Sequence, residues 1–178
     1  MSAIEAGWDA PFEWIGEDTT QAEKVKIGGI IKNRSLSMLG ILAIPDRPGL
    51  AAAIFSALGA RKVSCRLIVH TRDMNNLTSI VICVTRGDLE PGLEVLNSIS
   101  QRVEAGGVIY EKDVGMFSIF GPHFGQRPGI AGIMFSGLAS AGISILAIST
   151  SISSVSCIIH GDDIDNAVRA TSEVFELP

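Results

Sequence analysis

The chain has 178 residues, of which 47% are hydrophobic and 19% charged, and its formal net charge is -5. This composition is typical of an acidic globular protein with a well-developed core. The 14 Lys and Arg residues are scattered and form no basic stripe, so we expect no nucleic-acid partner. No apolar run reaches the ~20 residues that a membrane span requires, so we expect no membrane association and a cytoplasmic location. The three cysteines lie in apolar runs without metal-ligand spacing, which predicts buried, reduced thiols and no metal or cofactor.

The first 23 residues contain both tryptophans but show no clear periodicity. We therefore expect residues 1–23 to form a mobile arm. The apolar run 25–32 follows and predicts a strand.

Residues 37–112 alternate between strand and helix patterns. Apolar residues with helical spacing predict two helices, and β-branched runs on either side of a turn at 72–76 predict a hairpin. In chain order we expect strand 37–45, helix 49–61, strands 63–71 and 77–85, helix 88–104 and strand 107–112. The order βαββαβ is that of a ferredoxin-like module.

The rest of the chain repeats this module. Residues 47–58 and 127–138 are identical at seven of twelve positions with a constant offset of 80, which is improbable by chance. The second copy predicts strand 115–121, helix 129–141, strands 143–150 and 153–160, and helix 163–175. Its last strand is missing, and the unpartnered strand 25–32 can supply it.

The sequence thus predicts an α/β (α+β) protein of two ferredoxin-like modules, one inserted into the other. We expect residues 36–113 to form the first module, and residues 24–34 plus 114–178 to form the second.

In both copies the first strand runs into an Arg-Pro-Gly turn and then a helix. The amides of a first helical turn lack intrahelical partners and attract a carboxylate. Asp46, just ahead of the first turn, can accept hydrogen bonds from an ammonium group, so the pair would recognise a zwitterion. The alternative is that Pro48 and Pro128 only start the helices and Asp46 only stabilises its turn.

The Asp-Arg-Pro-Gly and Arg-Pro-Gly loops, the Ser149-Thr150-Ser151 run and the helix 163–175 resemble the tandem ACT domains of aspartate kinase, the regulatory portion of that enzyme. The resemblance covers residues 25–177. It implies two ACT modules that pair with those of a second chain as a homodimer, and lysine or threonine bound between modules. It also implies allosteric feedback control of aspartate-family amino-acid biosynthesis, no catalytic site in this chain and, if phosphotransfer occurs, a separate kinase catalytic chain.

The resemblance also implies the ligand-binding residues, which lie on the two loops and on the hairpin facing the first loop. They are Asp46, Arg47, Pro48, Gly49, Leu50, His70, Thr71, Thr78, Ser79, Gln126, Arg127, Pro128, Gly129 and Ile130.

The hairpin departs from the family pattern. Family members usually carry Val-Gln-Asn at 69–71 and Thr-Thr-Asp-Ile at 77–80, where this chain has Val-His-Thr and Leu-Thr-Ser-Ile. Loss of acidic groups argues against a cationic ligand side chain, because a buried ammonium without a partner is costly. A small neutral or hydroxylated amino acid, or no ligand, fits better. His70 either replaces the lost amide as a donor or is a strand histidine without function.

Three other functions compete with feedback control of aspartate kinase. A stand-alone ACT sensor would act on another partner, and a dimerisation scaffold would pair its edge strands without any ligand. An independent enzyme is disfavoured, because the chain has no phosphate-binding loop, no nucleophile motif and only three scattered histidines.

Overall fold

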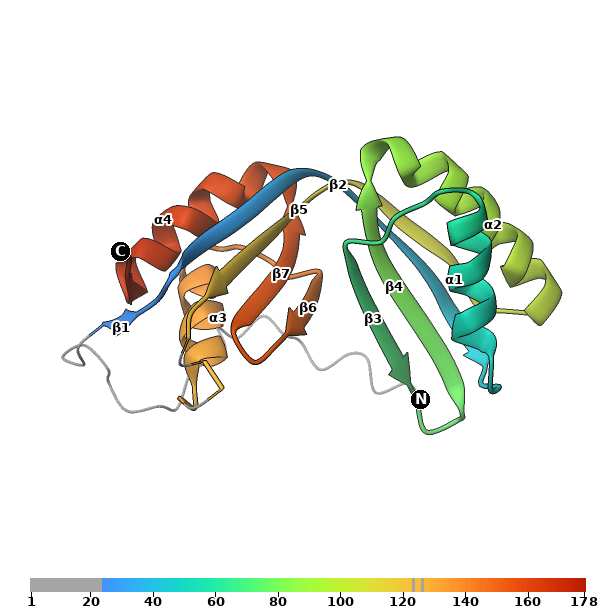
Figure 1. The fold of residues 1–178 in the computed structure, drawn as a ribbon, viewed down its shortest axis with the longest axis horizontal. Helices are drawn as coiled ribbons and strands as arrows, with labels where there is room; N and C mark the ends of the chain where they lie inside the picture. The colour runs from blue at the N-terminus through green and yellow to red at the C-terminus, as the bar shows by residue number, and fades with distance from the viewer. Residues whose placement is uncertain (1–23, 123, 126) are drawn as a thin grey trace, which may run out of the picture.

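A computed structural model describes residues 24–122, 124–125 and 127–178 of the chain (Figure 1). The expected arm, 1–23, lies outside the described residues. The elements, in chain order, are β1 (Val25–Lys26), β2 (Gly29–Pro45), α1 (Leu50–Ala60), β3 (Leu67–Arg72), β4 (Leu77–Thr85), η1 (Arg86–Asp88), α2 (Leu89–Val103), β5 (Gly107–Phe120), α3 (Ile130–Ser140), β6 (Ala147–Thr150), β7 (Ser154–His160), η2 (Gly161–Asp163), α4 (Ile164–Val174) and β8 (Phe175–Glu176). No helix among the described residues is long and apolar enough to cross a bilayer.

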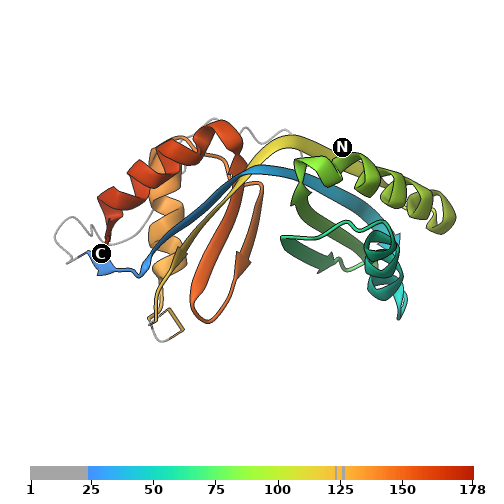
Figure 2. The ribbon, with the colours of Figure 1, turned by 45° about the horizontal axis from the view of Figure 1, so that its top comes forward.

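The strands form one antiparallel sheet of six in the order β3-β4-β2-β5-β7-β6, while β1 and β8 form a small parallel pair. Each half of the sheet, with its two helices, is one ferredoxin-like module, and both modules share the central strands β2 and β5. Figures 1 and 2 show the result as two lobes joined by an arch, with α1 and α2 on one lobe and α3 and α4 on the other. The predicted fold class, including the insertion of one module into the other, is confirmed.

The central strands are longer than the sequence predicts. The predicted strand 25–32 is divided: residues 25–26 form β1, and the residues from Gly29 onward continue into the predicted strand 37–45 as β2. The predicted strands 107–112 and 115–121 are joined as β5. Polar residues interrupt the apolar pattern where the predicted strands meet, but β2 and β5 remain hydrogen-bonded to each other on both sides of the interruption. The pairing shifts register on β2 between Asn33 and Leu36 and between Leu36 and Met38. The first half of β2 pairs with the second half of β5, as expected for the strand that completes the second module.

The first hairpin strand of each module is shorter than predicted. β3 begins at Leu67 and β6 at Ala147, not at residues 63 and 143. The apolar residues at those positions end the preceding helices instead, since the amides of Val63 and Ile143 donate to the carbonyls of Leu58 and Leu138 at 3.0 Å. Such contacts are typical of helix C-termini.

Among the described residues, buried apolar side chains form three clusters. One cluster lies between the sheet and the helices of the first module and includes Leu39, Ile82 and Leu96. A second cluster lies between the sheet and the helices of the second module and includes Phe117. A third cluster lies on the open face of the sheet where the modules meet. Its buried members are Leu36, Leu67, Cys83, Val114 and Ile158.

Candidate functional site

The first Arg-Pro-Gly loop connects β2 to α1 and is tied to the hairpin turn of its module. The Asp46 amide donates to the Asn76 carbonyl at 2.9 Å. Gly49 precedes the helix with φ 92° and ψ -9°, a left-handed conformation that disfavours any side chain. The exposed Arg47 and Pro48 and the half-buried Leu50 surround it. The turn thus points the start of α1 toward the surface.

The second loop repeats this geometry. The Gly121 amide donates to the Ser153 carbonyl at 2.9 Å, and Gly129 precedes α3 with φ 87° and ψ -7°. Arg127 and Pro128 are exposed, and Ile130 is buried at the start of α3. Gln126 lies outside the described residues. The sequence repeat therefore preserves a helix-entry conformation, and not only a core pattern.

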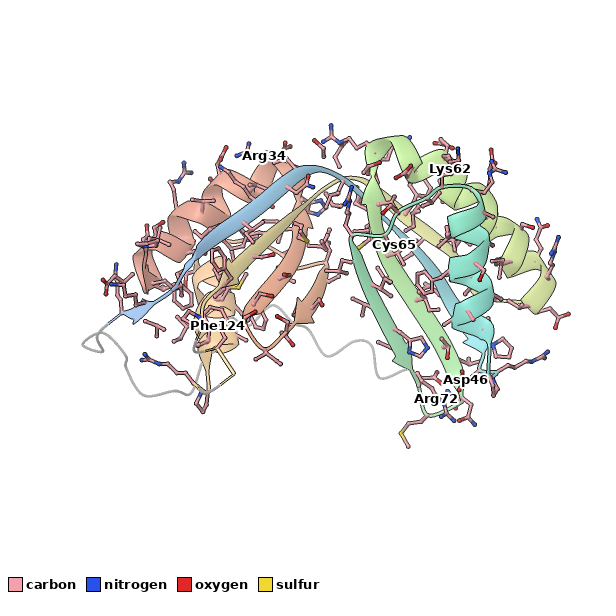
Figure 3. The ribbon with its side chains drawn as sticks, viewed as in Figure 1. Arg34, Asp46, Lys62, Cys65, Arg72 and Phe124 are labelled. Atoms are coloured by element: carbon pink, nitrogen blue, oxygen red, sulfur yellow. The ribbon has the colours of Figure 1, made fainter. Side chains whose placement is uncertain are left out.

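The Asp46 carboxylate already has two partners (Figure 3). The Thr78 hydroxyl, which is fully buried, donates to one carboxylate oxygen at 3.2 Å, and the Arg72 Nε lies 3.3 Å from the other. Arg72 also donates to the side-chain oxygen of Asn76. The carboxylate expected to receive a ligand ammonium is thus engaged by the protein's own guanidinium.

Strand pairing divides the four hairpin residues between the two faces of the sheet. His70 pairs with Ile80 of the first core and Arg72 pairs with Thr78, so these side chains lie on the helix-covered face beside Asp46. Thr71 pairs with Ser79 on the alternate positions, which face the other side. The Ser79 hydroxyl there accepts a hydrogen bond from the Ala43 amide at 3.1 Å. The structure therefore brings Thr78 to Asp46, with His70 on the same face, and places Thr71 and Ser79 elsewhere.

Arg72 and Asn76 are residues of this site that sequence reasoning missed, because both fell in the predicted turn. Arg72 had one available signal: it lies two positions after His70, and therefore on the same face of a strand.

The two loops of one chain lie on separate lobes. Figure 3 shows Asp46 on the lobe of α1 and α2, and Phe124 of the second loop on the lobe of α3 and α4. Phe124 packs against the second core and closely covers Gly121, where an added Cβ would lie 2.7 Å from its ring. The chain therefore presents two separate helix-entry loops instead of one shared pocket.

Comparisons with known proteins agree with this architecture. A family model described as an ACT domain matches residues 117–175. An aspartate kinase of Stutzerimonas stutzeri is 34% identical over 161 residues, which are 90% of this chain and 39% of that protein. The regulatory subunit of aspartate kinase from Thermus flavus superposes with a TM-score of 0.78 at 27% identity, over 85% of this chain and 99% of that one. A structure of aspartokinase alpha and beta subunits matches with a TM-score of 0.75 at 26% identity, over 83% of this chain and 97% of that one.

The fold and the two Arg-Pro-Gly loops define a protein built of two ACT domains. The chain is similar, more particularly, to the regulatory portion of the aspartate kinases, which confirms the resemblance seen in the sequence. It spans about two fifths of the length of the curated relatives it matches, but almost the whole of the regulatory subunit. The chain is thus similar to the regulatory portion alone.

Proposed function

We propose that this chain is the regulatory component of an aspartate kinase, which binds a small amino acid and thereby controls aspartate-family biosynthesis by feedback. The observation that carries the proposal is the match to a regulatory subunit of aspartate kinase over 99% of that subunit's length. The preserved loop geometry supports a ligand role, because Gly49 and Gly129 adopt the same left-handed conformation ahead of α1 and α3.

The loops recognise the ligand carboxylate through the first-turn amides of α1 and α3, which the helix dipole makes favourable for an anion. The Asp46 carboxylate and the Thr78 hydroxyl receive the polar groups of the ligand, and Gln126 and Arg127 do so on the second loop. The Asp46 carboxylate is already shared with Arg72, so once it accepts from the ligand's α-ammonium group it cannot also offset a second cation such as the lysine side chain. A small neutral or hydroxylated amino acid therefore suits this loop.

The functional unit is a homodimer formed through the ACT modules. β3 and β6 are the two edges of the sheet, and each has an isoleucine facing solvent on the helix-covered side: Ile68 is 47% exposed and Ile148 is 41% exposed. Such apolar edge strands are ready to pair with another chain. The two Arg-Pro-Gly loops of one chain lie on separate lobes and cannot form a joint site. Pairing across a two-fold axis would place a loop of one chain near a loop of the other.

The dimer acts on a separate catalytic chain, in line with the alpha and beta subunits named for one similar structure. Unpaired cysteines in the buried core support a reducing, cytoplasmic compartment. We assign residues 36–113 to the first module and residues 24–34 plus 114–178 to the second, since the register shifts of β2 fall at this boundary.

Thermal unfolding in the presence of each of the twenty amino acids tests the proposal, because a ligand that binds only the folded state raises the midpoint. We expect a selective rise with a small neutral or hydroxylated amino acid, and a dimer in sedimentation. A dimer whose midpoint no amino acid shifts would instead favour the ligand-free scaffold. A selective shift without any effect on a co-purified kinase chain would favour a stand-alone sensor.

A further inference from the structure

A group of charged side chains lies where the two modules meet, on the side of the sheet that carries the helices. It surrounds a cavity of about 480 Å³ between the ends of η1 and η2, and its members are Arg34, Arg86, Asp113, Asp162 and Asp165. Figure 3 shows Arg34 near the top of the arch, where β2 passes from one lobe to the other. These charges take no part in either Arg-Pro-Gly loop.

Arg34 is bonded from both modules at once. Its guanidinium donates to the Asp165 carboxylate at the start of α4 in the second module. Its backbone carbonyl accepts a hydrogen bond of 3.2 Å from Arg86, which belongs to η1 of the first module. The Arg34 hydrogen bond holds the pKa of the Asp165 carboxyl below its ordinary value.

Two further pairs complete the group. Arg86 lies 3.1 Å from the Asp113 carboxylate on β5, and Lys32 on β2 lies 3.8 Å from Asp165. Each bond therefore joins one of the two shared strands to the first turn of η1 or α4. We call the set formed by Arg34, Arg86, Asp113 and Asp165 the junction clamp.

The opposite face of the same junction is apolar. There the third cluster buries Leu36 and Val114 of the shared strands against Leu67 of the first module and Ile158 of the second. The register shifts of β2 lie at the same place. Bending of the sheet about this apolar cluster would move the η1 and α4 ends apart or together, and the clamp spans that gap.

We propose that the junction clamp sets the angle between the two ACT modules, with the apolar cluster as pivot and the Arg86 side chain, which bonds Asp113 of the first module and the Arg34 carbonyl of the second, as the link between them. The inference does not depend on any ligand of the Arg-Pro-Gly loops. Because the clamp residues are exposed, bulk salt screens their interactions, so the angle depends on ionic strength. Such a device would couple the orientation of one module to that of the other.

The test measures the distance between the modules by double electron–electron resonance. Nitroxide labels are placed on α2 and α4 through Ser98→Cys and Glu173→Cys, two exposed positions. Burial raises the pKa values of the Cys83 and Cys157 thiols to about 12, so labelling near neutral pH favours the introduced cysteines. Label uptake by the chain without them provides the background from Cys65.

Arg86→Gln is the clamp variant, because it removes the hydrogen bond to the Arg34 carbonyl that crosses between the modules, and Arg61→Gln is the matched control. The control breaks the Arg61–Glu94 pair between α1 and α2 within the first module, with side chains 52% and 62% exposed against 55% and 73% for Arg86 and Asp113. The double variant Arg34→Gln/Arg86→Gln removes both cations, and Arg86→Lys retains the charge. Circular dichroism confirms that each variant is folded before labelling.

We expect the parent chain and Arg61→Gln to give the same narrow distance distribution at about 20 mM salt, where screening is weak. Arg86→Gln should broaden and shift this distribution, and the double variant should do so further. About 1 M salt should change the parent in the same way while leaving the double variant unaltered. Unchanged distances in the double variant, an equal change in Arg61→Gln, or a parent distribution indifferent to salt would overturn the proposal.

Discussion

Replacing Gly129 by alanine tests whether the second loop has a left-handed backbone conformation at the residue before α3. With φ at 87°, alanine there adopts a left-handed conformation, which costs about 1–2 kcal/mol. An added Cβ meets nothing within 4 Å, so crowding does not contribute and the cost is that of the backbone alone.

Gly132, inside α3, is the matched control because an added Cβ there also meets nothing within 4 Å. In a helix interior the same substitution stabilises by about 0.5–1 kcal/mol. The two variants carry the same chemical change and should differ in free energy of unfolding by about 1.5–3 kcal/mol, with opposite signs relative to the parent. Urea denaturation measures both, and a Gly129→Ala protein as stable as the parent would refute the loop geometry.

Three other predictions concern single side chains. Asp46→Ala leaves the buried Thr78 hydroxyl without its acceptor and should lower the free energy of unfolding by about 1–3 kcal/mol, whereas Asp46→Asn keeps an acceptor oxygen; urea denaturation of both variants tests this. Burial raises the pKa values of Cys83 and Cys157 from 9.0 to about 12. The unfolded chain therefore loses these thiol protons first, and stability should fall as pH rises above about 9; a slope unchanged in the double alanine variant would contradict this cause. Phe117→Ala removes a fully buried ring from the second core and should cost about 3–5 kcal/mol, and a cost below about 1 kcal/mol in denaturation would contradict that packing.

The repeat made most of the fold predictable from sequence. Residues 47–58 and 127–138 share enough identities to reveal two modules, and helical spacing then located their helices. The continuity of β2 and β5 could not be predicted, because the polar residues at 32–35 interrupt the apolar alternation while backbone pairing continues through them. The apolar pattern of the sequence indicates which side chains are buried, whereas the ends of a strand depend on its backbone hydrogen bonds.

The positions of the two loops were predictable from the repeated Arg-Pro-Gly sequence, because proline and glycine favour turns. The engagement of Asp46 by Arg72 was not, because it depends on the register between β3 and β4 and on where the turn places a long side chain. The junction clamp likewise joins residues 131 positions apart, Arg34 and Asp165, which no local pattern connects.

Calorimetric titration of the folded protein with threonine and, separately, with lysine tests the central claim most directly, because it measures binding itself. The account predicts saturable binding of the small hydroxylated amino acid, weakened in both Asp46→Ala and Gly129→Ala, and no binding of lysine. Tight binding of lysine, or the absence of saturable binding of threonine, would contradict it.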